Sequence, residues 1–238
     1  MKLSRKGKKM NFMDKSKNVI SGDSKFAIVE GYKIARTNLV FSLSAAESNV
    51  VAFTSWSKGE GKSTATANLA ISFSKMDKKV LLIDADLRRP NVHNLMKLQN
   101  SAGLSEVIGK FKSFDEVINR DVLPYLDVLT SGSIPPNPSE LLASQNFSAM
   151  LEVLRKDYDY IILDTPPVGV VADALILKDL VAGYVVVVRE KFTTHGDIEK
   201  ALQSIRLADS KVLGFLKVGC AASERKYSKG QYGYYKYY

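Results

Sequence analysis

The stretch Ser55-Trp56-Ser57-Lys58-Gly59-Glu60-Gly61-Lys62-Ser63-Thr64 decides the fold of this chain. It follows the apolar run 50–53 and opens a segment with a helical pattern, which gives the order strand, glycine loop, helix. Two glycines let successive backbone N–H groups turn inward onto a polyphosphate. Lys62 can then reach the β and γ phosphates, and the Ser63 hydroxyl can bind Mg²⁺. The stretch therefore predicts a binding site for ATP or GTP.

This loop is a variant of the G-x-x-x-x-G-K-[ST] pattern, because Trp56 stands where the first glycine is usual. The alternative interpretation is a glycine-rich turn before an ordinary helix, and the strand and helix on either side argue against it. The residues expected to contact the nucleotide are Gly59, Glu60, Gly61, Lys62, Ser63 and Thr64.

Further apolar runs alternate with stretches long enough for helices. Strands that are apolar on both faces and alternate with helices indicate a parallel sheet covered on each side. The expected fold class is therefore α/β, with a mostly parallel central sheet and helices on both faces. The runs occupy residues 80–83, 126–129, 160–163, 184–188 and 212–216.

Three carboxylates follow predicted strands directly, at the edge where such sheets bind ligands. Asp84 and Asp86 come after one strand, and Asp164 ends a Walker B-like run of four apolar residues. Each aspartate alone could be a helix cap or a turn residue. Together beside the glycine loop they favour a site that manages Mg²⁺ and the transferred phosphate. Arg88 and Arg89 either face the phosphates or form a solvated pair, and the sequence leaves this open.

Two other segments carry local predictions. Residues 26–46 have apolar positions at mixed helical spacing, which predicts an amphipathic helix leading into the first core strand. The proline-rich segment 134–142 predicts a rigid turn, with Ser139 as a cap for a helix beginning near Glu140.

Length and composition predict one domain in the cytoplasm. The chain has 238 residues, of which 45% are hydrophobic, and this is enough for a single core. No apolar run approaches the roughly 18 residues that span a bilayer. The only cysteine, Cys220, has no partner for an internal disulfide, which fits a reducing compartment. The expected divisions are a basic flexible arm (1–24), a nucleotide-binding domain (25–222) and a tyrosine-rich tail (223–238).

The formal charge of +9 is concentrated at the chain ends. Residues 1–17 carry seven basic side chains and one acidic one, and residues 217–238 carry five and one. The body between them is nearly neutral, which argues against a nucleic-acid-binding face. The basic ends could meet an anionic membrane or an acidic partner, or they could simply be solvated.

Together these motifs resemble the bacterial tyrosine kinases, which are relatives of the MinD and ParA ATPases. The resemblance rests on the glycine loop, Asp84-Ala85-Asp86 with Arg88 and Pro90, Asp164-Thr165-Pro166-Pro167, the Pro-Pro-Asn-Pro-Ser-Glu-Leu-Leu segment and the tyrosine-rich end. It covers roughly residues 26–238. It implies transfer of phosphate from ATP to protein tyrosine, with Mg²⁺ as the metal.

The tail distinguishes this family from its ATPase relatives. Phenols on a flexible segment can enter a neighbour's active site without any unfolding, so the tail is expected to be phosphorylated in trans. A sticky disordered end is the alternative. The expected phosphoacceptors are Tyr227, Tyr232, Tyr234, Tyr235, Tyr237 and Tyr238.

The resemblance also implies roles for the site residues. Lys62 would hold the β and γ phosphates, Ser63 would bind Mg²⁺ directly, and Asp84, Asp86 and Asp164 would manage the metal and its waters. Lys62, Asp84 and Asp86 are thus the expected catalytic residues, and Ser63, Asp86 and Asp164 the expected metal ligands. Asp84 is the candidate base for the phenolic proton.

The family's E-x-x-R-x-x-R motif, used for ring assembly, is matched here by Glu30, Lys33 and Arg36, with Lys33 in place of the middle arginine. The alternative for these three is a set of exposed charges on one helix. Two further departures are Lys58, where family members often have proline, and Val218, where an asparagine near the adenine is usual.

The sequence-based hypothesis is a cytoplasmic tyrosine kinase that regulates polymerisation and export of a capsular or extracellular polysaccharide. The resemblance implies a separate transmembrane activator or polysaccharide copolymerase that recruits the chain to the inner face of the membrane. It also implies a ring-forming homo-oligomer and a cognate tyrosine phosphatase. The rival hypotheses are a MinD/ParA-like positioning ATPase and a nucleotide-binding scaffold with little catalysis.

Overall fold

The computed structural model describes residues 19–220 except 23 and 45. In this part of the chain, strands alternate with helices and form one seven-stranded sheet in the order β3-β4-β2-β5-β1-β6-β7. The strands are β1 (Val50–Ser55), β2 (Val80–Asp84), β3 (Asn119–Leu123), β4 (Leu126–Leu129), β5 (Tyr160–Asp164), β6 (Gly183–Arg189) and β7 (Val212–Val218).

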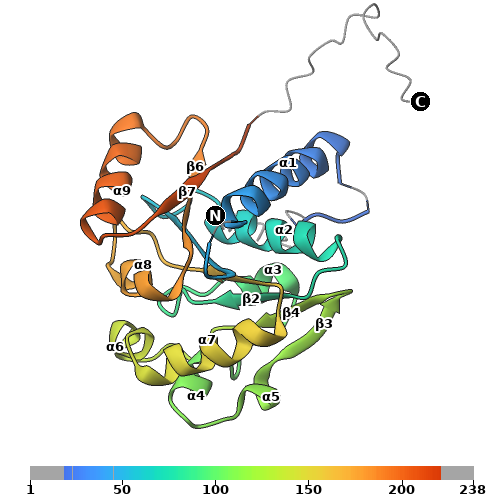
Figure 1. The fold of residues 1–238 in the computed structure, drawn as a ribbon, viewed down its shortest axis with the longest axis vertical. Helices are drawn as coiled ribbons and strands as arrows, with labels where there is room; N and C mark the ends of the chain where they lie inside the picture. Colours follow the sequence, from blue (N-terminus) through green and yellow to red (C-terminus); the bar gives the residue numbers. More distant parts are fainter. Residues whose placement is uncertain (1–18, 23, 45, 221–238) are drawn as a thin grey trace, which may run out of the picture.

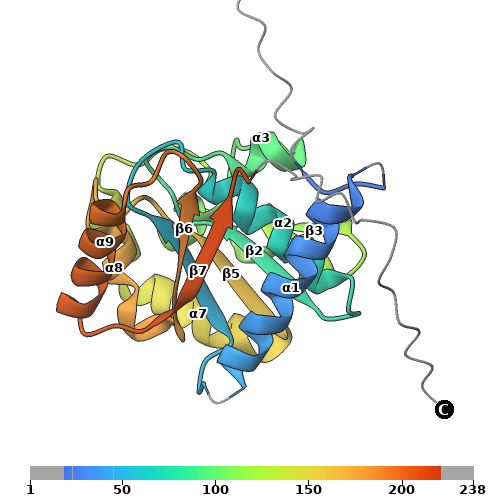
Figure 2. The ribbon, with the colours of Figure 1, turned by 90° about the horizontal axis from the view of Figure 1, so that it is seen from above.

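Helices cover both faces of this sheet (Figure 1, Figure 2). The helices are α1 (Phe26–Leu43), α2 (Lys62–Ser74), α3 (Val92–Met96), α4 (Leu104–Ile108), α5 (Phe114–Val117), α6 (Pro138–Leu142), α7 (Gln145–Asp157), α8 (Asp173–Ile176) and α9 (His195–Leu207), with a 3₁₀ turn η2 (Lys178–Leu180).

The core lies in two layers because side chains alternate across each strand. In β1, Val50 and Ala52 join the layer under α7 and α9, whereas Val51 and Phe53 join the layer under α1 and α2. All six β1 residues are buried. Burial on both faces explains why the strands read as continuous apolar runs rather than as alternating patterns.

The sheet confirms the expected α/β class and adds one strand that the sequence did not indicate. Strand β3 pairs antiparallel with β4 at the sheet edge, whereas every other pairing among the described residues is parallel. The β3 sequence, Asn-Arg-Asp-Val-Leu, is mostly exposed and polar, so it lacks the apolar run by which the inner strands were predicted.

The expected helix near residues 26–46 is present as α1, but only its C-terminal half packs firmly. Leu39 and Leu43 are buried, while Phe26, Ile34 and Phe41 remain 78%, 61% and 72% exposed. The amphipathic prediction is therefore only partly right, because much of the apolar surface of α1 faces outward. No helix among the described residues has the length and apolar character needed to cross a bilayer.

Candidate active site

The glycine loop between β1 and α2 adopts a backbone that favours glycine. Gly59 and Gly61 have φ values of 85° and 84°, in the left-handed region that residues with a Cβ rarely adopt. Gly61 is also the N-cap of α2, and no side chain caps this helix end. The first N–H groups of a helix without a side-chain cap are available to an anion. The loop thus has the backbone geometry of a phosphate cradle.

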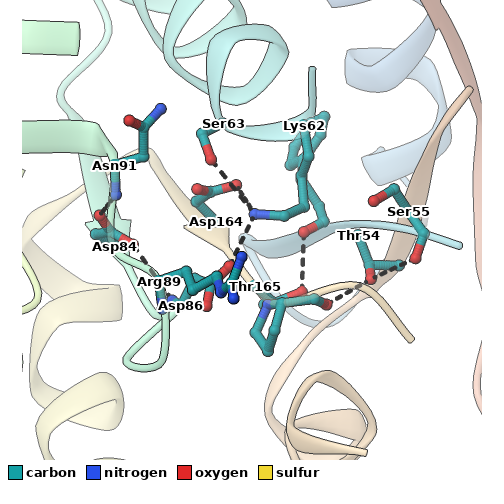
Figure 3. A network of polar contacts seen from close by, with 12 residues as sticks. Thr54, Ser55, Lys62, Ser63, Asp84, Asp86, Arg89, Asn91, Asp164 and Thr165 are labelled. Atoms are coloured by element: carbon teal, nitrogen blue, oxygen red, sulfur yellow. Dashed lines mark hydrogen bonds and ion pairs between the residues drawn. The ribbon is translucent and has the colours of Figure 1, made fainter. Parts of the chain in front are cut away.

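Lys62 begins α2 and lies buried among carboxylates from two strands (Figure 3). Its Nζ is 2.7 Å from Asp164 Oδ1 and 3.7 Å from Asp86 Oδ2. Burial alone lowers the pKa of Lys62, but the nearby Asp164 and Asp86 charges outweigh it and raise the pKa above its ordinary value. Lys62 therefore keeps its positive charge at the edge of the sheet where the loop lies.

A cavity of about 700 Å³ opens beside this lysine. Its wall includes all six residues predicted to contact the nucleotide, together with Asp86, Arg88 and Arg89. Lys58, the residue often replaced by proline in the family, lines it as well. The structure thus brings the predicted cofactor-binding residues together around one opening at the carboxyl edge of the sheet.

Glu60 braces the loop through its buried carboxylate. It is 1% exposed, and its Oε2 accepts the Ser57 N–H at 2.9 Å. Its Oε1 accepts the hydroxyl of Thr193, in the connection between β6 and α9. Arg189 at the end of β6 donates to the Gly59 carbonyl at 2.9 Å. Two contacts therefore hold the glycine loop against the β6–α9 connection.

Asp84, the candidate base, is held by the loop that follows β2. It is fully buried, and its Oδ2 accepts the backbone N–H groups of Asn91 and Val92 at 3.0 and 2.9 Å. Its Oδ1 accepts the Asp86 N–H at 3.3 Å. Burial raises the pKa of Asp84 to about 7, and the negative charge of Asp164 adds to this shift. Asp84 thus fixes the loop after β2 and does not line the cavity.

Asp86 is the carboxylate of this pair that reaches the cavity. It is 6% exposed and lines the opening beside Lys62. Burial raises its pKa, against the opposing effect of the Lys62 charge. Of the two aspartates after β2, Asp86 is the one that lines the cavity.

Asp164 at the end of β5 has one oxygen that fits a hydrated metal. Its Oδ1 accepts from Lys62 Nζ at 2.7 Å and from Thr66 Oγ1 at 3.2 Å. Its Oδ2 is buried and has no hydrogen-bond partner within the described residues. A buried carboxylate oxygen without a partner is costly unless a ligand satisfies it. Ser63, Asp86 and Asp164 therefore fit a Mg²⁺ ion that also binds phosphate oxygens and water.

Side chains of this type do not form a metal cage by themselves. Among the residues that the structure describes, no group of three or more His, Cys, Asp or Glu side chains is arranged to hold an ion. This is expected for Mg²⁺ in a P-loop site, where a hydroxyl, a carboxylate and the nucleotide share the coordination.

Arg88 and Arg89, which the sequence left open, have different surroundings. The Arg88 guanidinium pairs with Asp173 of α8, with Nε 2.6 Å from Oδ2 and Nη2 3.0 Å from Oδ1. The Arg89 backbone N–H donates to Asp86 Oδ1 at 3.1 Å, while its side chain is exposed at the cavity. The Arg88 side chain is thus held by Asp173 while 40% of it remains exposed, and the Arg89 side chain is exposed as well.

Ser139 was expected to cap α6, and this prediction is wrong. The N-cap of α6 is Asn137, with Pro138 at the first position of the helix. The Ser139 hydroxyl instead donates to Asp173 Oδ1 at 2.8 Å and accepts from Arg88 Nη2 at 2.9 Å. Sequence reasoning could not find Asp173, because nothing around this single aspartate marks it as a partner of the loop after β2.

Trp56 and Val218 occupy two of the positions where the chain departs from the usual patterns. Gly169 packs so closely on Trp56 that a Cβ there would lie 2.5 Å from the indole ring. Val218 at the end of β7 approaches Gly61, where a Cβ would lie 3.5 Å from Val218 Cγ2. Both large side chains therefore contact the edges of the glycine-loop region.

The predicted oligomer residues on α1 do not all behave alike. Glu30 and Lys33 form an exposed ion pair at 2.7 Å. Arg36 instead turns toward α2, where its Nη1 donates to the Ser72 carbonyl at 2.6 Å. The six tail tyrosines predicted as phosphoacceptors lie outside the described residues.

Known proteins resemble this chain in sequence and in structure. Residues 48–217 match the family model described as an AAA domain. "Tyrosine-protein kinase YwqD" of Bacillus subtilis (strain 168) is 42% identical over 87% of this chain and 85% of its own length. "Putative tyrosine-protein kinase CapB" of Staphylococcus aureus is 35% identical over 85% of this chain and 91% of its own length.

Solved structures agree with these relatives. The kinase domain of the Escherichia coli tyrosine kinase ETK has a TM-score of 0.78 at 34% identity, covering 87% of this chain and 80% of that one. The chimerical protein CapA2B2 has a TM-score of 0.76 at 34% identity, covering 79% and 83%. MinD from Pyrococcus horikoshii, at 22% identity and a TM-score of 0.60 with 71% and 69% covered, shares the fold.

Proposed function

The chain belongs to the bacterial tyrosine kinases, and we propose that it transfers the γ-phosphate of ATP to tyrosines in the tail of a second copy of itself. One observation carries this proposal: Lys62, Asp86 and Asp164 converge at the mouth of the phosphate-binding loop. This arrangement supplies a cation for the phosphates and a carboxylate at the cavity, which phosphoryl transfer to a hydroxyl requires.

In the proposed reaction, the phenolic oxygen of tyrosine bonds to the γ-phosphorus while the bond to the β–γ bridging oxygen breaks and ADP leaves. The phenolic proton passes to a carboxylate, and we assign this role to Asp86 rather than Asp84, because Asp86 lines the cavity. Lys62 stabilises the negative charge on the phosphates. Mg²⁺, when bound by Ser63 and Asp164, would neutralise further phosphate charge and leave the Asp86 carboxylate to accept the proton.

The wider role follows the family. We propose that the kinase regulates polymerisation and export of a capsular or extracellular polysaccharide, in partnership with a separate transmembrane activator. That activator would recruit it from the cytoplasm to the inner face of the membrane, and a tyrosine phosphatase would reverse the modification. The relatives named EpsB and ptk are much longer, and this chain matches only 28% and 29% of their lengths. The rest of each relative supports the proposal that the kinase acts with a further protein segment.

The direct test is incubation of the purified chain with ATP and Mg²⁺, followed by mass spectrometry for phosphotyrosine and by measurement of released inorganic phosphate. Phosphotyrosine at residues 227–238 that disappears with a chelator is the expected result. Inorganic phosphate without phosphotyrosine would instead indicate a MinD-like ATPase. Tight nucleotide binding with neither product would indicate a scaffold.

A further inference from the structure

Three side chains from different elements are hydrogen-bonded to one another, and one of them, Arg88, lines the cavity. Arg88 lies in the loop after β2, Ser139 in α6 and Asp173 at the start of α8. Each of the three side chains contacts both of the others, at distances between 2.6 and 3.0 Å. Ser139 belongs to the proline-rich segment 134–142, and none of the roles assigned above uses that segment.

Asp173 is built as a fixed anchor. Its side chain is 2% exposed, and both of its oxygens accept hydrogen bonds from Arg88 or Ser139. The bidentate geometry fixes the plane of the guanidinium as well as its position. Helix α8 is itself tied to the sheet, because the buried Tyr184 of β6 donates its hydroxyl to the Ala174 carbonyl at 2.6 Å. Arg88 is therefore connected to the central sheet through Asp173 and helix α8.

The other end of this connection is Asp86. Arg88 follows Asp86 by two residues, and the next backbone N–H, of Arg89, donates to Asp86 Oδ1. Asp84 holds the same loop through three backbone N–H groups. Asp84 thus ties the start of the loop to its end, and Arg88 ties the middle of the loop to Asp173. Without the second attachment, residues 86–89 could shift relative to Lys62.

We propose that Asp173 and Ser139 are positioning residues, which fix Arg88 and thereby hold the Asp86 carboxylate in place beside Lys62. This inference rests on the proposed kinase function and extends it to residues far from the glycine loop in sequence. It also gives the proline-rich segment a role: with Asn137 as the cap of α6, the Ser139 hydroxyl is available for the contact.

The test compares kcat and KM for ATP in autophosphorylation, together with the Kd for ADP, in the full-length chain. Asp173→Asn and Arg88→Lys should each lower kcat by about 10- to 100-fold, since small displacements of a catalytic group are costly. The Kd for ADP should change less than about 2-fold in Asp173→Asn, because Asp173 does not line the cavity, whereas Arg88 does. The double variant should be no slower than the slower single variant, because both changes break the same contact.

Ser139 gives a milder variant that leaves the ion pair in place. Ser139→Ala should lower kcat by about 3- to 10-fold, and Ser139→Thr, which keeps the hydroxyl, should restore most of it. The matched control is Arg120→Lys, which alters an exposed arginine–aspartate pair with Asp115 away from the cavity and should leave kcat unchanged. Melting curves establish that each variant is folded.

Folded Asp173→Asn and Ser139→Ala variants with the kcat of the wild type would overturn the positioning role. Equal losses in kcat for Ser139→Ala and Ser139→Thr would also overturn it, since a hydroxyl contact would then not be responsible. A wild-type chain that labels no tyrosine would contradict the proposed function and this inference together. An active wild type with equally active variants would contradict this inference alone, so the two failures are distinguishable.

Discussion

We expect Lys62 to have two electrostatic roles, one with nucleotide and one without it. Without nucleotide it is the positive charge nearest to Asp86 and Asp164, which are otherwise buried acidic groups. With nucleotide it is placed to hold the phosphates. We predict that Lys62→Met abolishes phosphotyrosine formation and lowers the melting temperature of the nucleotide-free protein, because breaking a buried ion pair leaves charges uncompensated.

Mass spectrometry and circular dichroism melts would measure both effects. Lys58→Met is the control, since Lys58 also lines the cavity but takes part in none of the ion pairs found among the described residues. Normal labelling by a folded Lys62→Met chain would contradict the P-loop kinase mechanism itself. An unchanged melting temperature would contradict only the role of Lys62 as a countercharge.

The brace between Glu60 and Thr193 makes a second prediction at this scale. Thr193→Val keeps the side-chain shape but removes the hydroxyl donated to the buried Glu60 carboxylate. A hydrogen bond to a charged group contributes about 1.5–3 kcal/mol, so we expect ADP to bind roughly 10-fold more weakly as the glycine loop loosens. Titration of a fluorescent ADP analogue would measure the Kd. Thr193→Ser retains the hydroxyl and should bind like the wild type.

At the scale of elements, helix α1 combines an exposed charge pair with exposed apolar side chains. Because Glu30 and Lys33 are on the surface while Arg36 contacts α2, we expect two separable effects. The double variant Glu30→Ala, Lys33→Ala should shift the mass measured by light scattering toward the monomer without changing the melting temperature. Arg36→Ala should lower the melting temperature, because it leaves the Ser72 carbonyl without this donor.

An unchanged mass in the double variant would place the subunit contact on another surface. A reduced mass accompanied by unfolding would not count as support, which is why the melting curve is measured on the same samples. Lys25→Ala, near the N-terminal end of α1 and exposed, offers a control that removes one positive charge, as the Lys33→Ala change does.

Elements with strong local signals were predictable, and those held by distant partners were not. The inner strands and the glycine loop follow from buried apolar runs and from glycines in a phosphate-binding pattern. The edge strand β3 was missed because its polar sequence pairs only through its neighbour β4. Ser139 was assigned a local cap because sequence offers only nearby partners, whereas its hydroxyl contacts Asp173, 34 residues away.

The same distinction separates the two aspartates after β2. Their proximity to the nucleotide site could be predicted from the ends of parallel strands. Which of the two carboxylates faces the cavity could not be predicted. It depends on the turn of the loop and on the hydrogen bonds that Asp84 accepts from the backbone N–H groups of Asn91 and Val92. Sequence spacing alone does not determine that turn.

At the scale of the whole molecule, the catalytic site and the predicted phosphoacceptors belong to different parts of the chain. Described residues reach Cys220, and the six tyrosines follow between 227 and 238. Because the proposed reaction joins the site of one copy to the tyrosines of another, we predict that a chain ending at Ser223 binds nucleotide normally but shows almost no autophosphorylation. A Lys62→Met chain with an intact tail should not label itself.

Mixing these two inactive proteins is the decisive measurement. The truncated chain has an intact site and the Lys62→Met chain has an intact tail, so transfer between molecules should produce phosphotyrosine only on the second. The initial rate should rise with the concentration of either partner, since the reacting groups must first meet. If the mixture stays unlabelled while the wild type labels at a rate per molecule independent of its concentration, transfer occurs within one chain and the trans mechanism is wrong.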